Sequence, residues 1–483
     1  MRPPAPPPPA RILGLREAVL LIVGVVVGAG IFKAPSVVAS ATGHAGWMFL
    51  AWLFGGAVSL AGALCYAELA TAYSHPGGEY HFLKRAYGRG LAFLFAWARF
   101  SVITTSSIAL LAFVFGDYMQ QVLPLTWGRV PGATVYALAC IALLWMLNER
   151  GLRSGARAQS WLTAIVLAGL MLIVLSAFWL VALEPAASAA AAAPSAPAAA
   201  AAAGPGGGLP GPAAFGLAMV FVLLTYGGWN EAGYISAELK GGRRDMVRAL
   251  VLSVLVLTGM YLAVTWAYWR ALGMEGMAQS QALAADLLGL AFGATGAAVI
   301  SLLVAVASLT SINATMIVGA RCNYAVACDW DALARFSFWD GEGGTPRGAL
   351  RMQNAAAMLL VLLGAWAGAG FEAVVEFAAP VFWLFFLLTG LSLFVLRWRE
   401  PLARRPFRVP LYPLVPAVFC ASCGYMLWSS VAYVGAQRVG GVAAGWIGVA
   451  VLASGVLVLA AVQLAPGNPP LAGRPAPIRG KRP

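Results

Sequence analysis

The sequence predicts an all-α, polytopic membrane protein with twelve transmembrane helices, two of which are interrupted. Of its 483 residues, 61% are hydrophobic and only 10% are charged, which is not the composition of a soluble enzyme. Apolar runs of about 18 residues or more, the length that crosses a bilayer, occur twelve times. They cover residues 17–41, 47–72, 90–121, 132–148, 159–183, 213–238, 247–271, 295–319, 352–369, 373–396, 411–435 and 442–464.

The first run contains residues that a continuous helix in lipid avoids, namely Gly24, Gly28, Gly30 and Pro35. Backbone inside hydrocarbon has to satisfy its N–H and C=O groups internally, so an irregular segment there requires a polar cavity. We therefore predict an interruption at Gly28-Ala29-Gly30. Gly24-x-x-x-Gly28 also matches a helix-packing motif, and a lone motif of this kind favours packing.

A matching interruption follows the apolar run 215–224, where the chain continues T-Y-G-G-W-N-E through residues 225–231. Interrupted spans in corresponding positions of two chain halves are typical of transporters with inverted repeats and a binding site at the membrane midplane. Two such segments, each beside aromatic or polar residues, favour a cavity over simple helix packing.

The distribution of basic residues predicts the orientation. A net charge of +13 would suit nucleic acid binding in a soluble chain, but in so apolar a chain it marks cytoplasmic loops. With the N-terminus inside, internal segments carry 26 of the 31 Lys and Arg and external segments carry three, while Lys33 and Arg99 lie within spans. Both termini are therefore predicted to be cytoplasmic, and no nucleic acid partner is expected.

The segments outside the spans differ in composition. Residues 1–15 form a proline-rich tail without the apolar core of a cleavable signal, residues 184–211 form a low-complexity external linker, and residues 466–483 form a basic tail. The internal segment 75–88 predicts a short helix at the membrane interface. All six cysteines lie in or beside apolar runs, so no disulfide is predicted, and Cys420-x-x-Cys423 is interpreted as a pair of packing thiols.

Ionisable residues within the spans leave alternatives open. Glu68, near the inner end of its span, is interpreted as an acid that reaches the interface. Arg99 either faces a translocation path, because a charge at depth is costly and usually functional, or extends to the inner interface. Glu231 follows the second interruption and could titrate, contact a substrate side chain or face the inner aqueous path. The three histidines lie in loops, which does not favour an enzyme or a metal site.

An interrupted helix offers both electrostatic signs to a ligand. The N–H groups of residues 30–32, at the start of the outer half-helix, attract a carboxylate. The carbonyls of residues 26–28 and 224–226 accept hydrogen bonds from an ammonium group. A zwitterion such as an amino acid matches this pair of poles, and glycine lets it lie against the backbone.

Several motifs, in order, resemble the amino acid–polyamine–organocation superfamily, and within it most closely the L-type amino acid transporter branch. They are G-V-V-V-G-A-G-I-F-K-A-P, L-A-G-A-L-C-Y-A-E-L, P-G-G-E-Y with A-Y-G, T-Y-G-G-W-N followed by S-A-E-L, and S-I-N-A-T with A-R, within about residues 15–410. The resemblance implies a LeuT-like fold of five plus five helices in inverted repeats, with helices 1 and 6 broken. The repeats would cover residues 16–183 and 212–400, followed by helices 11 and 12 at 401–465.

The resemblance also implies the residues that bind substrate. The substrate carboxylate would meet the backbone of Gly28, Ala29, Gly30 and Ile31. The amine would meet carbonyls of Val26, Val27, Leu224 and Tyr226, with Gly227, Gly228, Trp229 and Asn230 completing the second break. Leu224 replaces the gating aromatic of the family, which argues against large aromatic substrates. The external cysteine that ties eukaryotic members to a heavy chain has no counterpart in residues 121–132, so no such partner is expected.

The coupling ion stays open between sodium and a proton, and no cofactor is expected. The fifth-span lysine of several relatives is absent, its aligned position being about Val166. By similarity to sodium-coupled relatives, five oxygen ligands would come from carbonyls and hydroxyls of Gly24, Val27, Ala307, Thr310 and Ser311. Alternatively, the two hydroxyls bond only within their own helix.

The expected function is secondary active transport of amino acids, more neutral than charged, by alternating access. The expected location is a plasma membrane of the bacterial inner-membrane type. Transport of amines or cationic amino acids attracted by Glu231, and amino acid exchange, are the alternatives within transport. A membrane nutrient sensor is the alternative outside it.

Overall fold

The computed structural model describes residues 13–28, 30–125, 131–183, 211–280, 282–340, 344–367, 379–436, 438–439, 442–443 and 445–464. The predicted tails lie almost wholly outside these residues, as do most of the predicted external linker, Ala29 of the first interruption and the side chain of Lys33.

The described residues are helical apart from loops and one small hairpin. The first half contains α1 (Leu15–Val26), α2 (Gly30–Thr42), α3 (Ala45–Ala72), α4 (Gly78–Tyr87), α5 (Arg89–Ala98), the π-helix η1 (Arg99–Thr104), α6 (Thr105–Val122), α7 (Gly132–Glu149) and α8 (Leu152–Leu183). The second half begins with α10 (Pro212–Thr225), the 3-10 turn η2 (Trp229–Glu231), α11 (Ala232–Ile235), the 3-10 turn η3 (Ser236–Glu238), α12 (Gly242–Gln279), α13 (Leu283–Phe292), α14 (Ala294–Asp329) and the 3-10 helix η4 (Asp331–Phe336). It ends with α15 (Arg347–Ala367), α17 (Ala379–Arg399), α18 (Leu414–Ala436), the antiparallel pair β1 (Arg438–Val439) and β2 (Val442–Ala443), and α19 (Gly445–Leu464).

Nine of the described helices are long and apolar enough to cross a membrane, which makes the chain a multi-pass membrane protein. The first and sixth predicted runs form shorter helices, because each is interrupted within the run. The last run contains the shorter apolar helix Gly448–Leu464. Large apolar side chains such as Trp161, Trp179 and Leu255 lie exposed on the outside of the bundle, as contact with lipid requires.

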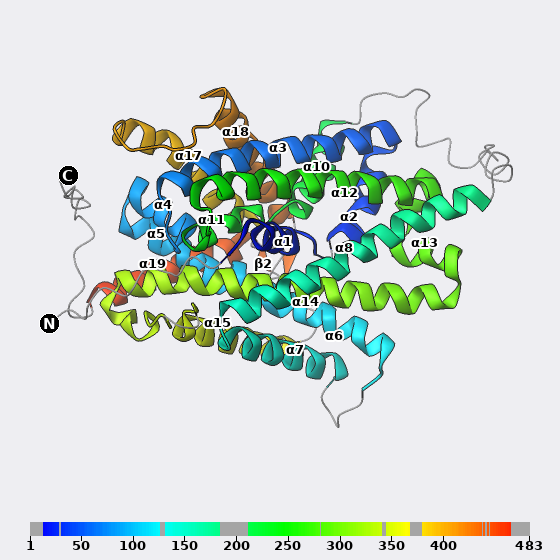
Figure 1. Ribbon diagram of the computed structural model, residues 1–483, viewed down its shortest axis with the longest axis horizontal. Helices are drawn as coiled ribbons and strands as arrows, with labels where there is room; N and C mark the ends of the chain where they lie inside the picture. Colours follow the sequence, from blue (N-terminus) through cyan, green and yellow to red (C-terminus); the bar gives the residue numbers. More distant parts are fainter. Residues whose placement is uncertain are drawn as a thin grey trace.

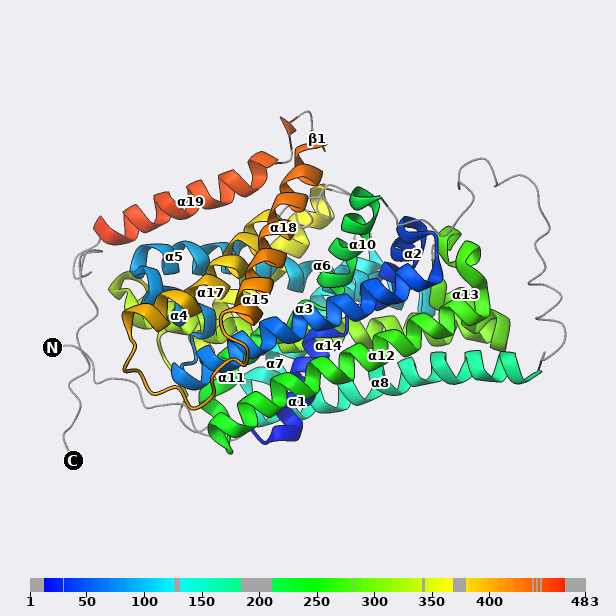
Figure 2. The same cartoon turned by 90° about the horizontal axis from the view of Figure 1, so that it is seen from above.

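α1 lies in the middle of the view in Figure 1 and packs against α8, α12 and α14. α4 and α11 lie towards one end of the bundle, and α2 and α13 lie towards the other (Figure 2). The two interrupted segments are therefore enclosed by long helices.

Small residues of α3 allow the second interrupted segment to pack closely. A Cβ atom at Gly56 would lie 3.2 Å from the Tyr226 hydroxyl oxygen, and one at Gly62 would overlap the Trp229 ring, lying 2.6 Å from its Cζ2. In lipid, association of helices depends on such close backbone approach rather than on the hydrophobic effect. The glycines of α3 thus position Tyr226 and Trp229.

A buried ion-pair group at the end of the bundle that carries α4 contradicts one prediction. Glu68 is only 1% exposed, and its carboxylate accepts hydrogen bonds from Arg397 at 2.5 Å and from the backbone N–H of Val409 at 2.7 Å. Arg405 lies 3.5 Å from the same carboxylate. The interpretation of Glu68 as an acid that reaches the interface is wrong, because α17 and the segment after it cover this side chain with two guanidinium groups.

The internal segment 75–88 forms the predicted short helix, α4, but the helix does not simply lie on the membrane surface. It packs against α5, α11, α14 and α17 and buries Glu79, Tyr80, Phe82 and Leu83. Cys420 and Cys423 are also buried, which agrees with packing thiols.

We expect acidification to destabilise the stacked pair His75 and His81 at the start of α4, whose rings lie 4.3 Å apart. Burial lowers the pKa of His75 to about 4, against an ordinary value of 6.5, so the unfolded chain binds more protons between these values and stability falls as the pH falls. The free energy of unfolding should drop by about 2 kcal/mol between pH 7.5 and pH 5 through this group. Melting curves of purified protein at the two pH values should show a smaller loss of stability in the His75→Asn variant than in the wild type. An equal loss in both proteins would contradict the prediction.

Candidate functional site

The first interruption separates α1 from α2. Val27 leaves helical geometry with φ −75° and ψ 88°, and Gly28 N–H donates to the Val26 carbonyl at 2.9 Å. The first N–H groups of α2, beginning at Gly30, have no acceptor in the preceding turn of their own helix. The break predicted from the glycine pattern is present, and it exposes the positive end of a helix dipole.

The second interruption follows α10. Gly227 N–H donates to the Leu224 carbonyl at 3.1 Å, and Gly228 adopts φ +115°, a conformation that favours glycine. Glu231 N–H then donates to the Gly228 carbonyl at 3.0 Å within η2. The chain thus turns sharply at the predicted second break.

The two breaks lie against each other. A Cβ atom at Gly30 would lie 3.2 Å from Thr225 Oγ1, and one at Gly228 would lie 2.9 Å from Val25 Cγ1. The Tyr261 hydroxyl of α12 joins them, because it lies 3.0 Å from the Thr225 carbonyl and 3.3 Å from the Val26 carbonyl. Sequence reasoning missed Tyr261, since a tyrosine within an apolar span gives no signal of its partner.

The predicted substrate-binding residues line this junction but differ in exposure. Side chains that are buried belong to Val26, Val27, Ile31, Tyr226, Trp229 and Asn230. Gly28, Gly227 and Gly228 are partly exposed, and Gly30 and Leu224 are exposed. Solvent therefore reaches the backbone of both breaks, while the surrounding side chains are packed.

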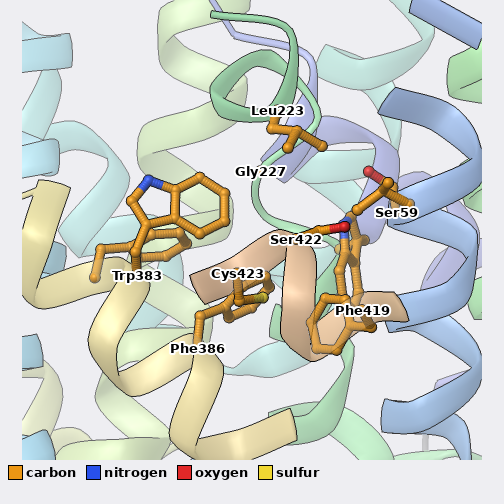
Figure 3. A pocket seen from close by; sticks show the side chains of 11 residues that line it. Ser59, Leu223, Gly227, Trp383, Phe386, Phe419, Ser422 and Cys423 are labelled. Carbon is orange, nitrogen blue, oxygen red and sulfur yellow. The ribbon is translucent and has the colours of Figure 1, made fainter. Parts of the chain in front are cut away.

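An apolar cavity of about 20 Å³ adjoins the second break, enough for about one water molecule. Figure 3 shows Trp383 of α17 on one side of it and Ser59 of α3 and Phe419 of α18 on the other, with Phe386 and Cys423 below and Gly227 above. The full lining is Val58, Ser59, Leu223, Gly227, Trp229, Phe382, Trp383, Phe386, Phe419, Ser422 and Cys423. These described lining residues include no Asp, Glu, His, Lys or Arg, so the cavity suits an apolar group.

Only some of the oxygens proposed as sodium ligands lie close together at the first break. Ser311 Oγ lies 3.4 Å from the carbonyls of both Gly24 and Val27, which brings α14 to the first break. The Thr310 hydroxyl instead donates to Val306 within its own helix at 2.7 Å. The local-bonding alternative therefore describes Thr310, whereas Ser311 reaches across to α1. Ala307, whose backbone carbonyl is the remaining proposed ligand, is buried.

Two polar residues of the fifth span, Gln159 and Thr163, lie against the helix before the first break. A Cβ atom at Gly24 would overlap the side chains of Gln159 and Thr163, so these two residues of α8 face α1. Thr163 Oγ1 donates to the Leu20 carbonyl at 3.1 Å.

A buried amide network, also missed, supports this contact. Asn313 Nδ2 donates to Gln159 Oε1 at 2.9 Å, and Asn148 Nδ2 donates to Asn313 Oδ1 at 2.8 Å. The signal was present in the sequence, because amides inside apolar spans are usually paired with one another.

Arg99 pairs with two acids. Its guanidinium forms an ion pair with Glu231 and a second, at 3.4 Å, with Glu79 of α4. Arg99 is 4% exposed, so the alternative that it reaches the inner interface is wrong. Glu231, in turn, is held by an arginine rather than left free for a ligand.

Among the described residues, no group of three or more His, Cys, Asp or Glu side chains could hold a metal ion. The polar groups gathered at the breaks are backbone amides, carbonyls and hydroxyls. Such groups can bind and orient a small zwitterion.

Comparison with known proteins gives a consistent result. The family described as amino acid permease matches residues 13–465. The b(0,+)-type amino acid transporter 1 of Homo sapiens is 29% identical over 402 residues, covering 83% of this chain and 78% of the relative. The Asc-type amino acid transporter 1 of Mus musculus is 28% identical over 430 residues, covering 86% and 75%. The mouse protein named large neutral amino acids transporter small subunit 2 is 27% identical over 462 residues, covering 92% and 80%.

The family match covers both interruptions and all nine long apolar helices. This family match agrees with the resemblance to the amino acid–polyamine–organocation superfamily that the sequence motifs indicate. The chain therefore belongs to the amino acid permease family, within the amino acid–polyamine–organocation superfamily, and is a membrane transporter rather than an enzyme.

Proposed function

We propose that this permease carries neutral amino acids by alternating access, with the substrate held between the two interrupted helices. The carboxylate binds the N–H groups of Gly28, Ala29, Gly30 and Ile31, and the ammonium group binds carbonyls of Val26, Val27, Leu224 and Tyr226. The observation that carries the proposal is the close contact of the two breaks through Tyr261. The Val26 carbonyl accepts from Gly28 N–H at 2.9 Å and lies 3.3 Å from the Tyr261 hydroxyl, so the ammonium group replaces the longer of these two contacts.

The substrate side chain enters the cavity beside Gly227, which supports neutral substrates with small apolar side chains. A cationic side chain would meet no carboxylate among the described residues of the lining. Glu231, which would attract a cation in the rival proposal, is already paired with Arg99. A relative named as a large neutral amino acids transporter supports the same choice.

The direct test is uptake by purified protein in proteoliposomes, with each radiolabelled amino acid supplied separately. We expect uptake of small neutral amino acids, and weak uptake of arginine, lysine and amines. Preferential uptake of cationic substrates favours the rival. Uptake that requires an amino acid inside the proteoliposomes identifies an exchanger. Specific binding without any transport supports a sensor.

Enlarging the cavity should change selectivity. Trp383→Ala is expected to raise the ratio of phenylalanine uptake to alanine uptake by about tenfold or more, since each methylene in an apolar pocket is worth about 1–3 kcal/mol. Competition assays in proteoliposomes measure this ratio. Trp161→Ala, at a lipid-facing tryptophan that is 69% exposed, is the matched control. An unchanged ratio in Trp383→Ala means that the side chain binds elsewhere.

The proposed organisation has twelve spans in a LeuT-like fold, with inverted repeats at residues 16–183 and 212–400. The equivalent breaks after α1 and α10 support it. Helices 11 and 12 occupy residues 401–465, and tails at 1–15 and 466–483 lie in the cytoplasm with the linker 184–211 outside. The excess of basic residues in alternate loops supports this orientation in a bacterial-type plasma membrane.

We infer that the chain works without a disulfide-linked heavy chain. Its cysteines occur at 65, 140, 322, 328, 420 and 423, outside every predicted external loop. Sodium coupling through Gly24, Val27, Ala307, Thr310 and Ser311 is supported by the approach of Ser311 to α1 but not by the hydroxyl of Thr310. Replacing sodium by choline in the uptake assay tests it.

A further inference from the structure

A group of three charged side chains lies buried next to the second break. Glu79 comes from α4, Arg99 from η1 and Glu231 from η2. Their side chains are 3%, 4% and 14% exposed, respectively. Three separate elements therefore bring ionisable groups to one buried place, which we call the acid–arginine cluster.

Arg99 is the centre of the acid–arginine cluster. Its Nη1 lies 3.4 Å from Glu79 Oε2, its Nη2 pairs with Glu231 Oε2, and its guanidinium stacks 4.4 Å from the centre of the Tyr234 ring. The other titratable groups close to the cluster are Tyr66 of α3, Tyr234 of α11 and Cys322 of α14. A phenol or a thiol is neutral or negative, so none of the three adds a positive charge.

The charges of the acid–arginine cluster do not balance. Two ionised carboxylates and one guanidinium leave one negative charge away from water among the described residues. An uncompensated buried charge costs several kcal/mol. The cluster therefore favours binding of one further positive charge.

The hydrogen bonds indicate which acid receives that charge. Glu79 accepts from four donors: the Tyr66 hydroxyl, Asn230 Nδ2 at 3.2 Å, the Tyr234 hydroxyl at 2.9 Å and Arg99. These donors occupy the acceptor positions of both Glu79 oxygens. Glu231 receives only Arg99, on one oxygen, and is the most exposed member of the cluster. A proton on Glu231 neutralises the cluster.

The acid–arginine cluster and the second break share the 3-10 turn η2. Glu231 and Asn230 both belong to η2, directly after Gly228. Trp229 of the same turn packs edge-on against Tyr66, with ring centres 5.2 Å apart, and Tyr66 donates to Glu79. A movement of η2 during transport would change the contacts of Glu231 with Arg99, so occupancy of the break and protonation of Glu231 are coupled.

We propose that Glu231 is the proton-binding site of this permease, and that one proton crosses the membrane with each amino acid. The proposal rests on the proposed function, since it gives that transporter its coupling ion. The Glu231 carboxylate takes up the proton when substrate binds and releases it on the other side. A bound proton is favoured over a substrate cation, because Arg99 repels a second cation from the same carboxylate.

The test uses purified full-length protein in proteoliposomes with two assays. Exchange of internal for external amino acid at equal pH reports transport alone. Net uptake driven by an acidic exterior reports coupling, with a trapped pH dye following proton entry. With one proton per substrate, a gradient of one pH unit supports about tenfold accumulation. We expect wild type to exchange, to accumulate substrate and to acidify the lumen.

Glu231→Gln, which mimics the protonated side chain, is expected to exchange amino acid but to lose the tenfold accumulation and the dye signal. Glu231→Asp keeps a titratable group and should retain both. Glu149→Gln, which removes the acid of the exposed pair with Arg351, is the control expected to behave as wild type. Accumulation and dye signal that persist in Glu231→Gln overturn the proposal.

A second measurement covers the case in which Glu231→Gln does not fold. Adding amino acid to unbuffered wild-type protein in detergent should remove about one proton per bound molecule from solution. Binding without proton uptake overturns the proposal, as does wild-type exchange without any pH-driven accumulation. Absence of exchange, uptake and binding for every amino acid overturns the proposed function itself, and the two failures are thereby distinguished.

Discussion

Replacing Arg321 by alanine is expected to destabilise the folded protein by about 3–5 kcal/mol, the range for removing one partner of a buried ion pair. Arg321 is 2% exposed and Glu238 is 1% exposed, and Arg321 Nε lies 2.5 Å from Glu238 Oε1 while Nη2 lies 2.8 Å from Oε2. Alanine would leave the Glu238 carboxylate buried without its cation. Melting temperature and the yield of monodisperse protein after extraction measure the loss.

The chain offers a matched control for this prediction. Arg351 forms an ion pair with Glu149 at the same distance, 2.5 Å, but the two side chains are 60% and 29% exposed. Arg351→Ala should cost about 0–1 kcal/mol, because water screens an exposed pair. A similar loss of stability in both variants would contradict the role assigned to burial.

Glu238, the acid of this pair, also lies beside the N-terminal end of the described residues. Glu238 accepts a backbone hydrogen bond from Leu13 at 3.0 Å, and Lys240 donates to the Leu13 carbonyl at 2.9 Å. These bonds tie the segment before α1 to the segment after the second break. Loss of the pair should therefore loosen both interrupted segments, and transport should fall together with stability.

Gly228→Ala is expected to reduce amino acid uptake by about tenfold or more. Gly228 has φ +115°, and a side chain in such a backbone conformation costs about 1–3 kcal/mol. Its Cβ would also lie 2.9 Å from Val25 Cγ1 and 3.3 Å from Val26 Cγ2. Either the second break changes conformation or the two breaks move apart. The N–H groups proposed for the substrate carboxylate and the carbonyls proposed for its ammonium group then no longer face each other. Initial uptake rates, corrected for the amount of reconstituted protein, measure the effect.

Gly259→Ala provides the comparison, because a Cβ at this position of α12 would meet no heavy atom within 4 Å. Alanine there should preserve uptake and raise helix propensity by about 1 kcal/mol. Wild-type uptake by Gly228→Ala would show that transport does not depend on the close contact of the two breaks.

The local features of this fold were accessible from the sequence. The length of apolar runs depends only on the thickness of the bilayer, and the interruptions at Gly28–Gly30 and after Thr225 follow from residues that a lipid-exposed helix excludes. The short helix α4 was likewise predicted from its own segment. The contacts that α4 makes with other helices were not predicted. Glu79, the acid that α4 contributes to the acid–arginine cluster, was not singled out either.

Partners distant along the chain were not accessible. Arg99 and Glu231 are 132 residues apart and Glu68 and Arg397 are 329 residues apart, and no pattern within either segment specifies the other. The contact of Gln159 and Thr163 with Gly24 is a further example, because nothing within α8 alone specifies which helix these side chains meet.

The sequence alone therefore determined that this protein crosses the membrane repeatedly, where two helices break, and that its family is one of amino acid permeases. These are properties of short segments and of their order. Only the tertiary structure decided that Tyr261 joins the two breaks, that Gln159 and Thr163 face α1, and that Arg99 stands between two acids. Burial and charge pairing depend on which helices pack together, and in lipid that packing is set by close side-chain fit that no single segment contains.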